Sequence, residues 1–301
     1  MSEGRIFSGE IPTLALLGAT YLVWAVGTIW IAPFSMVGAI ALAGLAAGLQ
    51  SSLSHEVLHG HPLRNPWLNG ALVFPALALF IPYMRFRDTH LAHHDDARLT
   101  DPYDDPETNF MDPQVWAKLS APLRVILRFN NTLLGRMLIG PLISQVMFMY
   151  GDGRAVLRGD GRVLAGWALH VPAVLLVVWW AVQVGQMPGW AYLVAAYLAL
   201  SLLKIRTFLE HRAHKDAPAR TVLIEDRGPL ALLFLNNNLH IVHHTHPGAP
   251  WHRLPAMYYA DPEKYRALND GYVYRSYGEV FGRYFLRAKD PVPHPLWKNH
   301  P

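Results

Sequence analysis

The sequence predicts an all-α membrane protein with four transmembrane helices paired into two hairpins. Residues 11–54 and 163–203 contain no Asp, Glu, Lys or Arg. A membrane-spanning helix needs about 20 apolar residues, so each block is long enough for two spans. The whole chain is 52% hydrophobic and 16% charged, with mean hydropathy +0.15. An ordinary soluble domain carries about 25% charged residues, so the low charge content agrees with membrane spans.

A turn divides each uncharged block. Ala32-Pro33 interrupts the first block, and the sequence QMPG at residues 186–189 interrupts the second. The intervening and following polar stretches are predicted to form a cytosolic, histidine-rich cap. The predicted spans are residues 11–32, 34–54, 163–184 and 189–204, the cap comprises about residues 85–162 and 205–301, and all belong to one membrane domain, residues 1–301.

Three shorter segments complete the expected organisation. Residues 65–84 are uncharged but contain Pro66, Pro75 and Pro82. Residues 137–150 are uncharged over a length that suits an interfacial or re-entrant helix better than a span. Residues 151–162, GDGRAVLRGDGR, are predicted to form a polar loop that enters the third span.

Charge and cysteine content limit the location and the chemistry. The amino-terminal sequence MSEGRIFSGE is a poor signal peptide, so the first span is predicted to be retained. Lys204 and Arg206 closely follow the last span, which puts that end and both termini in the cytoplasm. The absence of cysteine excludes disulfides, iron–sulfur clusters and thiolate metal sites. The net charge of +4 is modest and indicates no nucleic-acid partner.

Eight of the sixteen histidines lie in three boxes. An HxxxH box follows the second span, and two HxxHH boxes, HLAHH and HIVHH, place three imidazoles each on one face of a helical turn. Imidazole binds zinc, copper, iron and nickel. A single catalytic zinc takes only three protein ligands, so this set indicates two metal ions. The box residues are His55 and His59, then His90, His93 and His94, then His240, His243 and His244.

The boxes also constrain the membrane topology. After each hairpin the chain returns to its starting side, so the first and third boxes lie on the same side of the membrane. If residues 65–84 crossed, the second box would face the opposite compartment. We therefore predict that residues 65–84 enter the bilayer without crossing it, and that all boxes meet at the cytoplasmic face.

The order HxxxH, HxxHH, HxxHH around two hairpins resembles the membrane-bound fatty acid desaturase and hydroxylase superfamily, over about residues 11–260. The resemblance implies a four-span bundle with a cytosolic di-iron site, whose metal ligands are the eight box histidines and one further histidine after the last span. The segment RTFLEHRAH offers two candidates. We favour His211 and keep His214 as the second choice.

The resemblance also implies the reaction. Two non-haem iron ions would use O2 as co-substrate to attack a lipid acyl chain, most simply by introducing a double bond. The chain lacks a flavin or nicotinamide fingerprint, so electrons would come from an external donor of ferredoxin or cytochrome type. No catalytic residue is implied beyond the metal ligands. Carboxylates open to a supporting role behind the histidines are Glu56, Asp88, Asp95 and Glu210, although a solvated face explains Asp95 equally well.

Three alternatives remain open from the sequence. A lipid or carotenoid hydroxylase or ketolase would share the same boxes. A zinc membrane protease would use the HExxH match of His55, Glu56 and His59. A haem-binding membrane cytochrome would pair histidines within the bilayer. The remaining histidines of interest are predicted to lie outside the ligand set: His170 as a core residue, and His246 and His252 as structural or surface residues.

Overall fold

The computed structural model describes residues 10–95 and 97–297. Two compact units divide the chain by their contacts, and each is described by itself. The first unit runs to Arg87 and resumes at Leu142–Leu202, and the second comprises Asp88–Pro141 and Leu203–Pro301. Three helices contain residues of both units: α4 (Tyr83–His93), α8 (Gly140–Leu157) and α10 (Gly189–Thr207).

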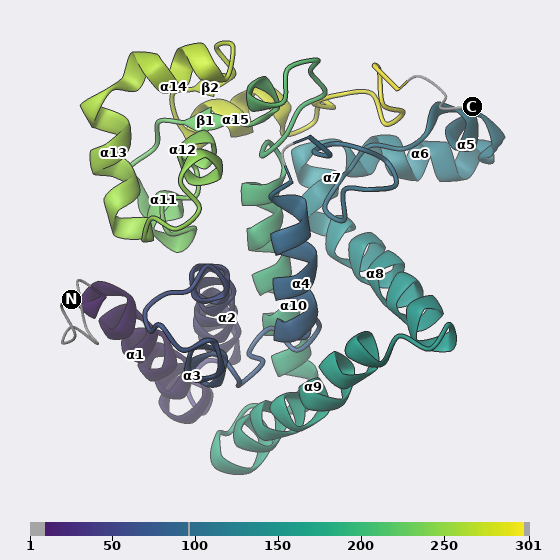
Figure 1. Ribbon diagram of the computed structural model, residues 1–301. Helices are drawn as coiled ribbons and strands as arrows, with labels where there is room; N and C mark the ends of the chain where they lie inside the picture. Colours follow the sequence, from purple (N-terminus) through teal and green to yellow (C-terminus); the bar gives the residue numbers. More distant parts are fainter. Residues whose placement is uncertain (1–9, 96, 298–301) are drawn as a thin grey trace. The chain divides into compact units, whose positions relative to one another are not determined.

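The first unit contains the membrane helices. Within the described residues, four helices are long and apolar enough to span a bilayer: Ile11–Ile31, Met36–Leu58, Gly161–Val184 and Gly189–Thr207. These match the four predicted spans, and the all-α membrane class is confirmed. The elements are α1 (Ile11–Val26) with a π-helical turn Gly27–Ile31, α2 (Met36–Leu58), α3 (Pro66–Leu72), the start of α4 (Tyr83–His93), α8 (Gly140–Leu157), α9 (Gly161–Trp179) with a π-helical turn Trp180–Val184, and α10 (Gly189–Thr207) (Figure 1).

Both hairpin turns lie where the sequence places them, and they contact each other. The backbone N–H of Gln186 donates to the carbonyl of Thr28 at 2.9 Å. The indole of Trp180 donates to the Thr28 hydroxyl at 3.2 Å and stacks on Trp24, with ring centroids 5.3 Å apart. The two turns are therefore joined by polar and aromatic contacts at one end of the helices.

Small residues allow the helices to approach closely. The buried core contains many alanines of α2 and α10, among them Ala43, Ala47 and Ala195. A Cβ atom added at Gly44 would lie 2.9 Å from the side chain of Leu198 and 3.0 Å from the carbonyl of Ala195. Small residues at helix interfaces are typical of membrane bundles, where close van der Waals packing drives association.

Residues 65–84 do not form a spanning helix. Only residues Pro66–Leu72 are helical before α4 begins, and Leu77 and Leu79 are buried in the core of the first unit. Irregular backbone at membrane depth needs internal hydrogen-bond partners, because lipid offers none. Side chains of five helices supply these hydrogen bonds. Tyr21 donates to the carbonyl of Leu72, and Gln50 donates to the carbonyls of Val73 and Pro75. The carbonyls of Leu77, Leu79 and Phe80 accept from Tyr192, His170 and Gln145, respectively.

Replacing Gln50 with leucine is expected to lower the melting temperature of the detergent-solubilised protein. The Gln50 amide lies 3.2 Å from the carbonyl oxygen of Val73 and 2.7 Å from that of Pro75. Leaving a buried carbonyl without a donor costs about 1–3 kcal/mol. Gln183→Leu is the matched control, because Gln183 is exposed in a membrane helix. Equal melting temperatures for the two variants would contradict a stabilising role of these hydrogen bonds.

The predicted polar loop at residues 151–162 is mostly wrong. Helix α8 continues to Leu157, so only a short turn separates it from α9. Asp152 is buried and accepts two hydrogen bonds from Arg85 at 2.9 Å and one from Trp167 at 2.8 Å. These tertiary contacts hold the glycine-containing segment in a helix despite its low helix propensity.

The second unit combines short helices with a two-stranded parallel sheet, in which Leu223 pairs with Val273. Its third-box helix is fixed to the first strand by backbone hydrogen bonds: Ile224 N–H donates to Asn238 at 2.8 Å, and Ile241 N–H donates to Val222 at 3.1 Å. The elements are the end of α4, α5 (Pro113–Lys118), α6 (Ala121–Asn130), α7 (Leu133–Leu138), a 3-10 turn Pro218–Arg220, β1 (Leu223–Ile224), α11 (Pro229–Leu233), α12 (His240–Thr245), a 3-10 turn Trp251–Arg253, α13 (Leu254–Ala260), α14 (Pro262–Leu268), β2 (Val273–Tyr274) and α15 (Tyr277–Tyr284).

Candidate metal centre

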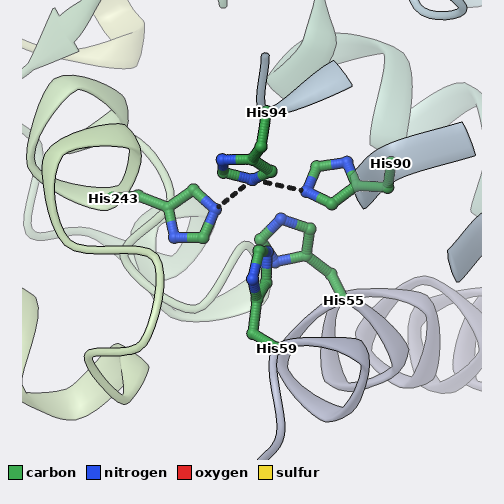
Figure 2. Close-up of side chains that lie close together, drawn as sticks. All are labelled: His55, His59, His90, His94 and His243. Carbon is green, nitrogen blue, oxygen red and sulfur yellow. Dashed lines mark hydrogen bonds between the residues drawn. The ribbon is translucent and has the colours of Figure 1, made fainter. Parts of the chain in front are cut away.

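The histidines of the second unit form two clusters. The first cluster comprises His90, His94 and His243. Their Nε2 atoms face one another, with His94 lying 3.0 Å from His90 and 3.2 Å from His243 (Figure 2). His90 belongs to α4, His94 directly follows that helix, and His243 belongs to α12, so two predicted boxes meet here.

The second cluster comprises His93, His211, His240 and His244. One ligand nitrogen from each lies within 4.8 Å of all the others. The Nε2 atom of His211 lies 2.9 Å from that of His93 and 3.3 Å from that of His240. His93, His240 and His244 are buried. The second and third boxes thus contribute to both clusters, and His211 joins the second.

Helical spacing explains why each HxxHH box divides between the clusters. Residues at i and i+4 project from one face of a turn, as His90 and His94 do in the first cluster and His240 and His244 do in the second. The middle histidine of each box, His93 or His243, belongs to the other cluster. One box therefore supplies ligand atoms at two neighbouring positions.

The structure separates the two candidates after the last span. His211 joins the second cluster, where its neighbours are imidazoles. His214 instead pairs with Asp270, at 3.5 Å, and lies beside Asp216. The α10 helix ends at Thr207, and a turn leads from it to His211, which forms an isolated β-bridge with Thr221.

The first-box histidines lie in the first unit. His55 belongs to the last turn of α2, and His59 caps the end of the same helix. Their ring centroids are 5.0 Å apart in an edge-to-face arrangement, and both extend from one helix end (Figure 2). The pair therefore has the i, i+4 geometry of two ligands on one helical face.

Polar groups behind the rings orient several of these nitrogens inward. The Nδ1 atom of His93 lies 2.7 Å from Asp105, and that of His90 lies 2.9 Å from Glu107. The Nδ1 atom of His240 lies 3.1 Å from the side-chain oxygen of Asn237. Because Nδ1 is bonded outward, Nε2 is the nitrogen presented to the cluster centre, which is the usual arrangement of metal-bound imidazoles.

Asp105 and Glu107 were missed by sequence reasoning, which offered four other carboxylates for this supporting role. The only available signal for the missed pair is the acidic sequence DDPET at residues 104–108, shortly after the second box. An acidic run of this kind is usually a solvated loop. The fold, rather than the local sequence, brings these two side chains behind the imidazoles.

Of the four carboxylates that the sequence offered, Asp95 and Glu210 have identified partners that are not histidines. Asp95 pairs with Arg98 at the surface. Glu210 does not contact a clustered ring in these hydrogen bonds; it accepts one from the Asn237 side-chain amide at 3.1 Å. Asn237 in turn contacts the His240 ring. Glu56 is buried in α2. Glu210 therefore reaches the second cluster through an asparagine.

Electrostatics differ among the clustered imidazoles. Burial by itself would lower the pKa of His93, but Glu107 and Asp105 outweigh burial and raise that pKa to about 9. Burial and the neighbouring imidazoles hold the pKa values of His211 and His240 well below their ordinary range. For Glu107, burial opposes ionisation, yet His90 and His93 lower its pKa. Asp105 and Glu107 therefore set His93 apart from His211 and His240, whose rings have no carboxylate among the causes of their pKa shifts.

The donor set fits transition-metal ions. Imidazole nitrogen is a ligand for iron, zinc, copper and nickel. With metal–nitrogen bonds of about 2.1 Å, two ligand atoms lie about 3 Å apart at right angles and about 3.4 Å apart in a tetrahedron. Four neighbouring Nε2 pairs in the two clusters, 2.9 to 3.3 Å apart, fall in this range. Each cluster can therefore hold one ion without a change of fold.

A family model described as fatty acid desaturase matches residues 29–276. The chain belongs to the fatty acid desaturase family. The match covers most of the chain and includes every histidine of the two clusters, so this desaturase-family protein is a membrane oxidoreductase that acts on lipids. No curated protein matches the chain significantly.

Other histidines of this desaturase-family protein have structural contacts. His170 hydrogen-bonds to the Leu79 carbonyl at 2.8 Å, as expected for a core residue. His246 lies 3.2 Å from the hydroxyl of Tyr265. His252 packs edge-to-face on its neighbour Trp251, with ring centroids 5.8 Å apart. Among the residues that the structure describes, neither histidine cluster includes any of these three side chains.

The two candidates after the last span are expected to respond differently to substitution. His211→Ala should reduce metal content and activity, because it removes a nitrogen 2.9 Å from the His93 nitrogen. His214→Ala should leave both unchanged, because His214 faces surface carboxylates. Metal analysis of the two purified variants measures the difference. Equal metal loss in both would contradict the assignment of His211.

Proposed function

We propose that the protein is a di-iron, O2-dependent fatty acid desaturase that introduces a double bond into a lipid acyl chain. The observation that carries this proposal is the pair of histidine clusters, in which ring nitrogens of boxes far apart in sequence converge at metal-ligand separations. Family membership supports lipid as the substrate and iron as the metal. The proposed ligands are the nine histidines expected from the sequence.

The first box completes the ligand set in this proposal. We assign His55 and His59 to the ion of the first cluster, because they form the HxxxH box at the end of a membrane helix. The other ligands of that ion would be the three histidines of the first cluster. The second ion would be held by the second cluster, in which His211 joins three box histidines.

The protein's own groups would bind and position. When bound, two iron ions supply the reduction of O2 and the cleavage of an unactivated C–H bond. Asp105, Glu107 and Asn237 hold the imidazole N–H groups outward, so the ring nitrogens need no rearrangement. Burial of the second cluster keeps bulk water from the reacting centre. The apolar bundle would hold the acyl chain, since positioning one methylene near the metals is the main task left to the protein.

The proposal also includes the membrane orientation of the protein and its electron donor. Residues 1–301 act as one membrane domain, with both termini and the metal centre in the cytoplasm, as Lys204 and Arg206 at the end of the last span favour. Electrons come from a separate ferredoxin- or cytochrome-type protein.

Lipid analysis of cells with and without the protein tests the reaction. Desaturation removes two hydrogen atoms from the acyl chain, whereas hydroxylation by the same scaffold adds one oxygen atom. Mass spectrometry of extracted lipids distinguishes these outcomes. A product containing new oxygen would replace desaturase by hydroxylase or ketolase, and unchanged lipids with peptide hydrolysis by a zinc-loaded protein would support the HExxH alternative.

The structure disfavours the two more distant alternatives. A zinc protease based on His55, Glu56 and His59 leaves both clusters of the second unit without a role. Axial histidines of a haem lie on opposite faces of the macrocycle. Ring nitrogens 2.9 Å apart, as in His93 and His211, leave no room for a porphyrin between them.

A further inference from the structure

One short loop supports both histidine clusters. Residues 100–107, here called the acidic loop, lie between the second box and α5. Asp105 lies 2.7 Å from the Nδ1 atom of His93, which belongs to the second cluster. Glu107, two residues later, lies 2.9 Å from the Nδ1 atom of His90, which belongs to the first cluster. Two carboxylates of one loop therefore contact histidines of different clusters.

The acidic loop is ordered by its own hydrogen bonds. The backbone N–H of Thr100 donates to one oxygen of Asp105 at 2.8 Å, and that of Glu107 donates to the other at 2.9 Å. Arg220 holds the chain just before the loop through the carbonyl of Leu99 at 2.8 Å. Asp105 is only 6% exposed. The Asp105 carboxylate is thus fixed behind His93 by the backbone of the loop itself.

Two other rings of the second cluster have neutral partners. His240 bonds to the amide of Asn237, and His211 lies 3.4 Å from the hydroxyl of Thr221. A carboxylate behind an imidazole fixes its tautomer and increases its electron donation to a metal. An amide fixes the tautomer but adds no negative charge. The ring partners therefore divide into charged and neutral ones within the second cluster.

We propose that Asp105 and Glu107 are positioning residues, one for each metal ion, that orient His93 and His90 and strengthen their donation to the metals. The inference rests on the proposed di-metal function and deepens it. Through these two residues, the acidic loop would raise the metal affinity and lower the reduction potential of the centre without contacting either ion.

Isosteric amides test the proposal. Asp105→Asn and Glu107→Gln keep the shape and the oxygen acceptor while removing the charge. Each variant is expected to bind Fe²⁺ or the probe Co²⁺ about 10- to 100-fold more weakly at one of two sites. The midpoint potential of the iron-loaded variants should shift to more positive values, because less negative charge stabilises the oxidised metal. Asn237→Asp should shift the potential in the opposite direction.

Asp95→Asn is the matched control, since Asp95 pairs with Arg98 at the surface and about half of its side chain is exposed. It should change neither affinity nor potential. Unchanged affinity and potential in both loop variants would overturn the inference. So would a loss of both ions accompanied by a lowered melting temperature, which would show a structural role only. Failure of the wild-type protein to bind metal would instead refute the proposed function itself.

Discussion

Replacing His93 with alanine is expected to abolish one of the two metal positions and reduce activity by about 100-fold or more. His93 contributes a nitrogen 2.9 Å from that of His211 and is almost fully buried. The substitution also leaves the buried carboxylate of Asp105 without its imidazole partner, 2.7 Å away in the native protein. Both effects act on the second cluster, so metal content should fall by about half when measured by plasma mass spectrometry.

His246→Ala provides the comparison for His93→Ala. His246 is a close neighbour of the third box, but its ring contacts the Tyr265 hydroxyl rather than another clustered histidine. This variant should keep its metal and its activity. Full metal content in His93→Ala would remove that residue from the ligand set, and severe metal loss in His246→Ala would mean that the third box extends further than proposed.

Gly44→Val should destabilise the membrane bundle by about 1–3 kcal/mol. The added Cβ would lie 2.9 Å from the Leu198 side chain and 3.0 Å from the Ala195 carbonyl. The side chain can move, but the carbonyl belongs to the backbone of α10, so α2 and α10 would have to separate. The melting temperature in detergent, or the unfolding midpoint in a denaturing detergent, measures this effect.

Gly18→Val separates packing from the general effect of losing a glycine. Gly18 also lies within a membrane helix, but a Cβ atom there meets nothing within 4 Å. The control should therefore be neutral or slightly stabilising. Similar losses of stability in the two variants would contradict close helix approach at Gly44.

The spans and the histidine clusters were predictable because their signals are local and periodic. Charge-free blocks can be read directly as hairpins, and HxxHH places its imidazoles on one turn whatever surrounds it. The structure places His211 in the second cluster and His214 beside Asp270, while the role of His211 as a metal ligand stays a prediction. The position of the metal centre relative to the membrane and the identity of its ions stay predictions.

The features missed depend on tertiary contacts between distant residues. Asp105 and Glu107 look like solvated loop residues until the fold brings them behind two imidazoles. Helix α8 continues through residues 151–157 because Asp152 meets Arg85 and Trp167, which no local pattern indicates. The donors to the carbonyls of residues 72–80 come from five helices. Sequence periodicity carries no information about such pairings.

The contact between the two hairpin turns has a mechanical consequence. Thr28, Trp180 and Gln186 hold the turns to each other. We therefore expect thermal separation of the four membrane helices to be smaller at this end than at the opposite one, where His55 lies in the last turn of α2 and His59 caps the helix. A long, flexible acyl chain would then enter between the helices at the end where they separate more, while the helices stay packed at the hairpin turns.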